Sequence, residues 1–116
     1  MAGSIFFVAE SAGEIVGFYG VERLSLLQFE LEALFVEPVH MGLGIGRALM
    51  THAKNFIAES GGSTLLIQGD PNAEGFYRAL GAQLIGKKES ASIPGRFLPM
   101  FLIEVSGGED TRIITP

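Results

Sequence analysis

The chain has 116 residues, no cysteine and a formal net charge of −5, and 47% of its residues are hydrophobic. This length fits one domain, and the lack of cysteine excludes disulfides and thiolate metal sites. Because the net charge is negative and the chain has no run of Lys or Arg, nucleic acid and anionic membranes are poor candidates for partners. No apolar run is long enough for a membrane span and no signal-peptide pattern opens the chain, so we expect a cytoplasmic location by default. The high apolar content favours a homodimer that buries extra surface.

Three strand patterns open the chain, over residues 5–9, 15–24 and 27–36. Because the connections between them are too short for crossovers, we expect an antiparallel meander. In the third strand apolar and polar residues alternate, which predicts one buried face and one face that carries Glu30 and Glu32. The apolar row at period two is Leu27, Phe29, Leu31, Ala33 and Phe35.

A glycine-rich junction follows the third strand. Pro38 ends that strand, glycines stand at positions 42, 44 and 46, and apolar residues then recur at helical spacing to about Ser60. The start of a helix leaves backbone N–H groups without partners and carries the positive end of the helix dipole. Since glycines let a ligand approach the backbone closely, the junction predicts an anion site suited to a phosphate or pyrophosphate.

The spacing of this junction excludes two common phosphate-binding motifs. The glycines read G-x-G-x-G, whereas the dinucleotide-binding fingerprint requires G-x-G-x-x-G. Arg47 and Ala48 stand where a P-loop has Lys followed by Ser or Thr, so no residue is in place to hold magnesium.

The second half of the chain predicts a short buried strand over residues 64–68. A right-handed crossover would place this strand parallel to the strand over 27–36. Asp70 or Asn72 can cap a short helix over 73–80, and strands over 83–87 and 96–105 follow. We expect residues 106–116 to form a mobile tail.

Two stretches resemble motifs of the GNAT superfamily of acetyl-CoA-dependent N-acetyltransferases. Val36-Glu37-Pro38 and residues 41–46 resemble motif A, V-x-P followed by R/Q-x-x-G-x-G/A, with Met41 in place of the usual Arg or Gln. Residues 72–81 resemble the later motif N-x-x-A/G-x-x-F-Y-x-x-x-G. Two motifs in this order are more specific than either alone. The resemblance covers roughly residues 5–105 and is consistent with a single domain over 1–105.

The resemblance implies an α+β, three-layer fold. The expected sheet is mixed and mostly antiparallel, with one parallel strand pair that splays apart and helices on both faces. Most family members begin with a further strand and two helices, which form much of the acceptor pocket. Here the first strand, near Ile5, already resembles the family's second strand, so the resemblance implies that the acceptor side is largely absent unless a partner subunit supplies it.

The resemblance also implies acetyl-CoA as cosubstrate, no metal, and a set of site residues. Tyr77 resembles the general acid that protonates the departing thiolate, and Asn72 resembles the residue that bonds the pantetheine arm. From spacing alone, Tyr77 could equally be a core aromatic and Asn72 a helix cap. The positions implied to contact acetyl-CoA are Leu34, Phe35, Val36, Met41, Gly42, Leu43, Gly44, Ile45, Gly46, Arg47, Asn72, Phe76 and Tyr77.

Glu30 and Glu32 are the candidate general bases. An amine with a pKa of about 10 is mostly protonated at pH 7, and only its neutral form attacks, so a nearby carboxylate could accept the proton. Glu30 matches the position that carries the base in several family members and ranks first. Two solvated carboxylates on the exposed face of a sheet would give the same pattern.

The sequence therefore predicts an N-acetyltransferase that moves an acetyl group from acetyl-CoA to a primary amine by direct attack. The acceptor would be a small molecule or a peptide. Two alternatives stay open: a non-catalytic acyl-CoA-binding module or subunit, and a structural remnant with neither ligand nor activity.

Overall fold

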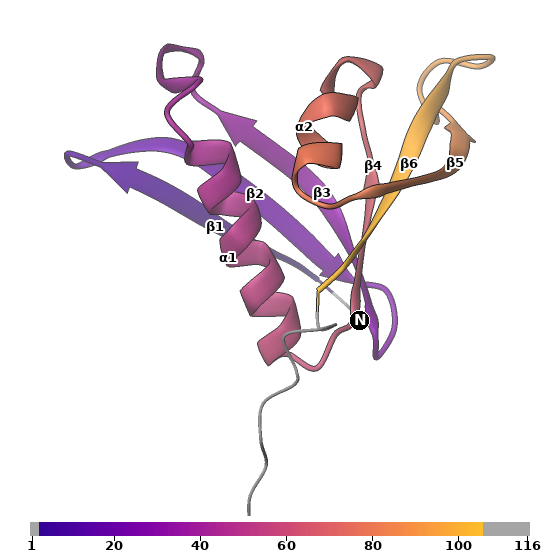
Figure 1. Cartoon of the computed structure of the whole chain (residues 1–116), viewed down its shortest axis with the longest axis horizontal. Helices are drawn as coiled ribbons and strands as arrows, with labels where there is room; N and C mark the ends of the chain where they lie inside the picture. The colour runs from indigo at the N-terminus through magenta and orange to yellow at the C-terminus, as the bar shows by residue number, and fades with distance from the viewer. Residues whose placement is uncertain (1–2, 106–116) are drawn as a thin grey trace, which may run out of the picture.

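Alternating apolar residues and short turns fold the first part of the chain into an antiparallel meander. The computed structural model describes residues 3–105 and places β1 at Ser4–Ser11, β2 at Glu14–Arg23 and β3 at Gln28–Val36. Gly13, at a φ of +84°, occupies the turn between β1 and β2, where its conformation suits a tight reversal. The predicted meander is confirmed (Figure 1).

The rest of the chain adds two helices and three strands to this meander. After the 3-10 turn η1 (Pro38–His40) come α1 (Ile45–Glu59), β4 (Thr64–Gln68), the 3-10 turn η2 (Pro71–Ala73) and α2 (Glu74–Ala79), and then β5 (Gln83–Glu89) and β6 (Phe97–Glu104). The strand order is β1-β2-β3-β4-β6-β5, and β3–β4 is its parallel pair. The predicted mixed, mostly antiparallel sheet is confirmed. The predicted tail, residues 106–116, lies outside the described residues, in which no helix is both long and apolar enough to cross a membrane.

The two helices lie on one face of the sheet, which corrects the expectation of helices on both faces. The Lys54 ammonium of α1 donates a hydrogen bond to the Leu80 carbonyl just after α2, at 3.4 Å. Both helices contribute to a single core, in which Ile57 of α1 and Tyr77 of α2 belong to the same cluster as Leu65 of β4. The parts of the chain described here therefore cover one face and leave the other without a helix (Figure 1).

A bulge in β3 breaks the period-two apolar row. Val21 pairs with Leu31, but the preceding residue, Gly20, pairs with Ala33, so Glu32 is the extra residue. An extra residue shifts the side chains that follow it to the opposite face. The core-facing residues are accordingly Phe29 and Leu31 before the bulge and Leu34 and Val36 after it. Phe35 lies on the other face, where its ring stacks on Phe18 at 5.5 Å.

The parallel pair β3–β4 is short, and this opens the sheet. Residues 28–31 of β3 pair with residues 64–67 of β4, and the pairing stops there. Figure 1 shows the two strands side by side at one end of the sheet and diverging toward the other. The edge of β3 beyond Leu31 consequently has no neighbouring strand on that side. Such a gap at the carboxyl end of parallel strands is where open sheets bind ligands.

Candidate functional site

The glycine loop before α1 presents a run of unpaired backbone donors. Gly42 and Gly44 adopt φ angles of +83° and +85°, which favour glycine. The first helical hydrogen bond runs from the Ala48 N–H to the Gly44 carbonyl, at 3.0 Å. Within the described residues, none of the N–H groups of residues 42–47 donates a hydrogen bond. The predicted start of a helix with free donors is confirmed.

The charges around this loop suit an anion. The first turn of α1 contains no acidic residue and carries Arg47, so nothing there opposes the positive end of the helix dipole. A cavity of about 580 Å³, which we call the glycine-loop cavity, opens beside the loop. Its lining is Leu34, Val36, His40, Met41, Gly42, Gly44, Ile45, Gly46, Arg47, Asn72, Ala73, Phe76 and Tyr77.

Gly46 lets α2 approach the start of α1. A Cβ atom at this position would lie 3.1 Å from the Cζ atom of Phe76. The absence of a side chain therefore seats the Phe76 ring against the first turn of α1. This contact closes the glycine-loop cavity on one side and fixes where α2 places Tyr77, the next residue.

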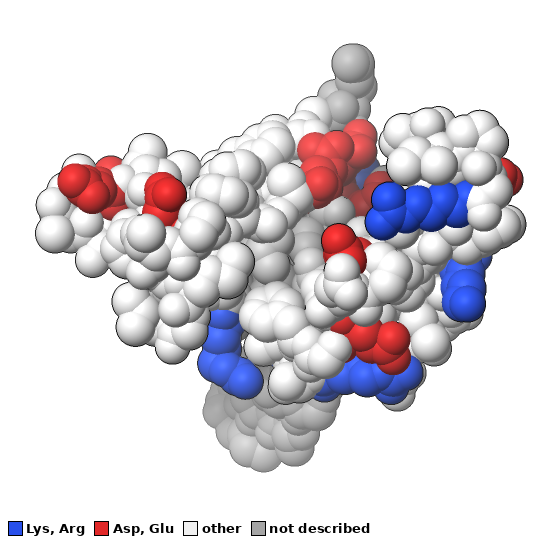
Figure 2. Space-filling model, turned by 90° about the horizontal axis from the view of Figure 1, so that it is seen from above, with Lys and Arg blue, Asp and Glu red and all other residues white. Residues whose placement is uncertain are grey.

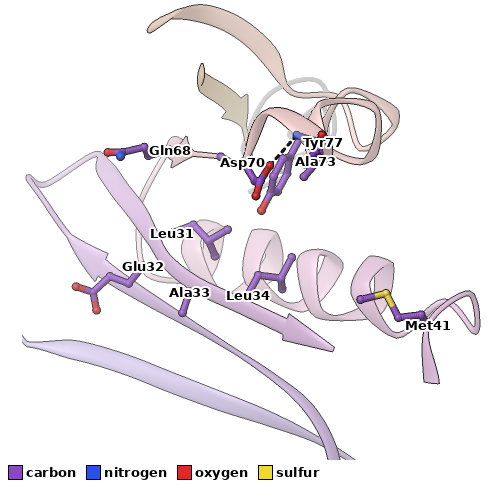
Figure 3. A pocket seen from close by; sticks show the side chains of 11 residues that line it. Leu31, Glu32, Ala33, Leu34, Met41, Gln68, Asp70, Ala73 and Tyr77 are labelled. Carbon is purple, nitrogen blue, oxygen red and sulfur yellow. Dashed lines mark hydrogen bonds between the residues drawn. The ribbon is translucent and has the colours of Figure 1, made fainter. Parts of the chain in front are cut away.

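A second cavity, of about 520 Å³, occupies the gap between β3 and β4 (Figure 3). We call it the strand-gap cavity. Five residues line both cavities, so the two form one continuous cleft from the glycine loop into the sheet. The shared residues are Leu34, Met41, Asn72, Ala73 and Tyr77, and the strand-gap cavity adds Leu31, Glu32, Ala33, Gln68, Gly69 and Asp70.

Tyr77 is the buried polar side chain of this cleft. The residue is only 8% exposed, and its ring lies 5.5 Å from that of Phe101. A Cβ atom on Gly69 would lie 3.2 Å from the Tyr77 ring, so glycine makes room for the ring there. Figure 3 shows the ring projecting from α2 toward β3 beside Asp70. The hydroxyl forms no hydrogen bond within residues 3–105, and burial, followed by the charge of Asp70, raises the pKa of the Tyr77 phenol.

Asp70 and Asn72 sit on the turn between β4 and α2. The Asp70 carboxylate accepts a hydrogen bond from the Asn72 N–H, at 2.7 Å, and so caps η2. The predicted cap therefore lies one turn earlier than expected: Asp70 caps η2, whereas α2 begins after Ala73 without a side-chain cap. The side chains of Asp70 and Asn72 also line the strand-gap cavity, because η2 turns the chain back over the end of β4.

The two candidate bases are placed differently. Glu32, the bulge residue, lines the strand-gap cavity and accepts a hydrogen bond from the Ser4 hydroxyl. Glu30 lies in the paired part of β3 between Glu22 of β2 and Leu66 of β4, and it lines neither cavity. In Figure 3 the Glu32 carboxylate points away from Tyr77.

Phe35 and Leu43, also implied by the resemblance, line neither cavity. Leu43 is 69% exposed and Phe35 follows the bulge onto the opposite face. Conversely, sequence reasoning did not assign Gln68, Gly69 or Asp70 to the site. Their position directly after a strand parallel to β3 is the signal that could have found them.

The chain matches the family model described as an acetyltransferase (GNAT) domain, over residues 2–81. It belongs to the GNAT acetyltransferase family. It is 34% identical over 82 residues to the N-alpha-acetyltransferase RimI of Mycobacterium tuberculosis, covering 67% of this chain and 51% of that protein. It is 41% identical over 69 residues to the streptothricin acetyltransferase of Streptomyces lavendulae, covering 58% of this chain and 36% of that one. The chain thus spans about half the length, or less, of these relatives.

Solved structures of GNAT enzymes share the fold. An aminoglycoside 6'-N-acetyltransferase complexed with coenzyme A superposes with a TM-score of 0.80 at 20% identity, covering 97% of this chain and 75% of that chain. Nourseothricin acetyltransferase superposes with a TM-score of 0.79 at 28% identity, covering 88% of this chain and 65% of that one. In the described part of this GNAT chain, no group of three His, Cys, Asp or Glu side chains is placed to hold a metal ion.

Proposed function

We propose that this GNAT domain is an acetyl-CoA-dependent N-acetyltransferase acting on a primary amine. The observation that carries the proposal is the cleft: unpaired N–H groups of residues 42–47 at one end, and at the other the hydroxyl of the largely buried Tyr77 side chain, which faces the gap between β3 and β4. Its relatives include proteins named as N-acetyltransferases, and neighbours of the same fold are solved with coenzyme A or acetyl-CoA bound.

The residues present fit acetyl-CoA. The N–H groups of residues 42–47 and Arg47 suit a pyrophosphate, because they offer donors and positive charge with no acidic side chain in the first turn. The lining shared by the two cavities is mostly apolar and suits a flexible arm, with Asn72 as an amide partner. Phe35 and Leu43 are proposed contacts through their backbone groups, since their side chains lie outside both cavities.

Acetyl-CoA supplies a thioester when bound: a C–N bond forms to the amine, the C–S bond breaks, the nitrogen loses one proton and the sulfur gains one. Tyr77 is the donor for the sulfur. Its raised pKa keeps the phenol protonated at neutral pH, and transfer to a thiolate with a pKa of about 8.5 is uphill by only a few kcal/mol. Glu32, or Glu30 acting through water, is the proposed acceptor for the proton that leaves the amine.

The proposal includes a homodimer located in the cytoplasm. On the sheet face opposite α1, the Phe6, Phe18 and Phe35 rings form a row across β1, β2 and β3, with centroid separations of 6.3 and 5.5 Å. Phe6 is 54% exposed and Phe35 is 45% exposed, and a partner would cover these rings. Light scattering should give twice the monomer mass, and a monomer at all concentrations would remove this part of the proposal.

The function is tested by isothermal titration of the purified chain with acetyl-CoA and with CoA, followed by a free-thiol assay with n-butylamine. We expect binding in the micromolar range and thiol release that depends on the amine. Binding without thiol release, with any of a panel of amines, would favour the non-catalytic acyl-CoA module. No binding at millimolar ligand would overturn both readings.

A further inference from the structure

The sheet face opposite the helices carries a row of exposed aromatic rings. Phe6, Phe18 and Phe35 lie on neighbouring strands of the meander, with centroid separations of 6.3 and 5.5 Å. We call these three rings the aromatic row. The Phe6 ring lies across the sheet at Gly20, where it leaves no room for a Cβ atom. A sheet buries its apolar face against a second layer, and within the described residues neither helix covers this face (Figure 1).

Carboxylates gather on the same face, beside the aromatic row. Glu22 of β2 pairs with Glu30 of β3 on one side and with Ser4 of β1 on the other. The Ser4 hydroxyl donates a hydrogen bond to the Glu32 carboxylate, which brings a third acidic residue to this place. We call Glu22, Glu30 and Glu32 the acidic group. Since paired residues share a face, and Ser4 and Phe6 stand two residues apart in β1, the acidic group and the aromatic row occupy one face of the sheet.

No basic side chain within residues 3–105 forms an ion pair with the acidic group. The one ion pair in this part of the chain joins Arg78 and Glu74 of α2. Arg23 is the single basic residue of β1–β3, and its guanidinium lies over the Phe29 ring, on the helix side of the sheet. Like charges directly opposite one another destabilise a sheet, so the two paired glutamates are unfavourable in the isolated chain. A cation supplied from outside would relieve this repulsion.

The opposite edge of the sheet carries a cation on this face. Lys88 of β5 pairs with Leu98 of β6 and therefore shares its face. Phe101 packs in the core beneath the helices, and Leu98, three residues before it in the same strand, points to the other side. Lys87, which pairs with Pro99, faces the helix side. Both lysines belong to a strand that is exposed along its whole length.

The two regions lie toward opposite ends of one face, and their charges are complementary. In Figure 2 acidic atoms and no basic ones lie at the left end, where Figure 1 places the β1–β2 turn, and basic side chains lie on the right, on the side of β5. We propose that a second copy of the chain packs on this face, with Lys88 of each copy against Glu22 and Glu30 of the other and the aromatic row buried between them. The inference rests on the homodimer of the proposed function and names the surfaces that would meet.

This arrangement closes as a dimer and reaches the strand-gap cavity. A two-fold axis that runs in the plane of the interface, between the two regions, places each region over the other, so both contacts form at once. Glu32 belongs to the acidic group and also lines the strand-gap cavity. The second copy would therefore lie beside that wall of the cleft and supply part of the acceptor side.

The test measures the dimer dissociation constant of charge-reversed variants of the full chain by sedimentation velocity over a series of concentrations. Glu22→Lys should raise this constant at least about tenfold, because two cations would then meet across the interface. The fold should persist, since the new ammonium would face Glu30 within the same sheet. Lys88→Glu should raise the constant similarly. Combining the two substitutions exchanges the charges of one pair, so the double variant should recover most of the affinity, which a merely misfolded variant would not.

Two controls separate the proposed face from the rest of the surface. Lys87→Glu makes the same charge change one residue away, on the helix side, and should leave the dissociation constant unchanged. Phe6→Ser should raise the constant at least about tenfold, because it removes an aromatic contact from the interface. Phe97→Ser is its match: Phe97 is 54% exposed, as Phe6 is, but it lies on the same side of β6 as Phe101, so its loss should have no effect.

Equal dissociation constants for Lys88→Glu, Lys87→Glu and the unmodified chain would overturn the inference and leave a homodimer that forms elsewhere on the surface. Lys88 would then be an edge-strand lysine that keeps β5 from pairing with other chains. A monomer at all concentrations would overturn both the inference and the homodimer. Acetyl-CoA binding and thiol release are measured independently, so failure of this inference is distinguishable from failure of the proposed acetyl transfer.

Discussion

The two ends of the cleft are made of different parts of the chain. At the glycine loop the interacting groups are backbone N–H donors of residues 42–47, and the side chains nearby are small or apolar. In the strand gap the interacting groups are the side chains of Tyr77, Asp70 and Asn72. The positions of backbone donors depend on the conformation of the loop. Such donors recognise a chemical group that all ligands of one class have in common. Side chains change with single substitutions, so the strand gap is where one member of the family can differ from another.

This difference explains how the phosphate end of the cleft can work with Met41 at this position. The usual Arg or Gln of motif A is replaced by a residue that is 65% exposed and lines both cavities. If the backbone supplies most of the phosphate contacts, losing one polar side chain weakens the site without abolishing it.

Gly44→Glu should have the largest effect. It forces a side chain onto a residue with a φ of +85° and adds a negative charge where an anion is proposed to bind. We expect acetyl-CoA affinity to fall at least about 100-fold, or about 3 kcal/mol, in isothermal titration. The matched control is Gly13→Glu in the β1–β2 turn, where φ is +84° and the space around a Cβ atom is equally open. Tight binding by Gly44→Glu would refute the assigned phosphate end.

Tyr77→Phe tests the strand-gap end. Because the hydroxyl has no partner within the described residues, its removal should leave folding and acetyl-CoA affinity nearly unchanged, while kcat should fall about 100-fold if the phenol is the general acid. Tyr19→Phe is the control: that phenol is also buried but is bonded to His52, at 2.7 Å, outside both cavities. A rate equal to that of the unmodified chain would leave Tyr77 as a packing residue.

The pH profile of kcat gives an independent check on the same residue. Burial and the Asp70 charge raise the pKa of Tyr77, so its protonated form persists up to and beyond about pH 10. Activity that depends on this proton is fully present below that pH and is lost as pH rises through the raised pKa. Asp70→Asn removes one cause of the shift, so the alkaline loss should move to lower pH. A profile whose alkaline limb does not move in that variant would contradict the coupling between the two groups.

The sequence predicted the phosphate end better than the strand-gap end, for a physical reason. Glycine spacing and the start of a helix are local patterns, so the glycine loop and the helix after it could be predicted from one short stretch. The bulge at Glu32 could not, because it depends on the register with β2, and its extra residue moves Phe35 away from the core. For the same reason, the alternation of apolar and polar residues in β3 placed Glu30 and Glu32 on one face and did not distinguish them. Of the two, only Glu32 lines the strand-gap cavity. The shared face of α1 and α2 likewise depends on long-range contacts such as Lys54 with Leu80.

Met41→Arg should have the smallest effect and the opposite sign. A guanidinium at this position would add a charged donor to a site now held mainly by backbone N–H groups, so acetyl-CoA affinity should rise about fivefold and become more sensitive to salt. Val39→Arg is the control, since Val39 is 81% exposed and lines neither cavity, and it should give only a weak, fully screened increase. If Met41→Arg instead lowered affinity at every salt concentration, then Met41 would be an apolar contact to the ligand arm. The part of the cleft in which backbone N–H groups bind the ligand would then be shorter than the run of unpaired donors at residues 42–47 indicates.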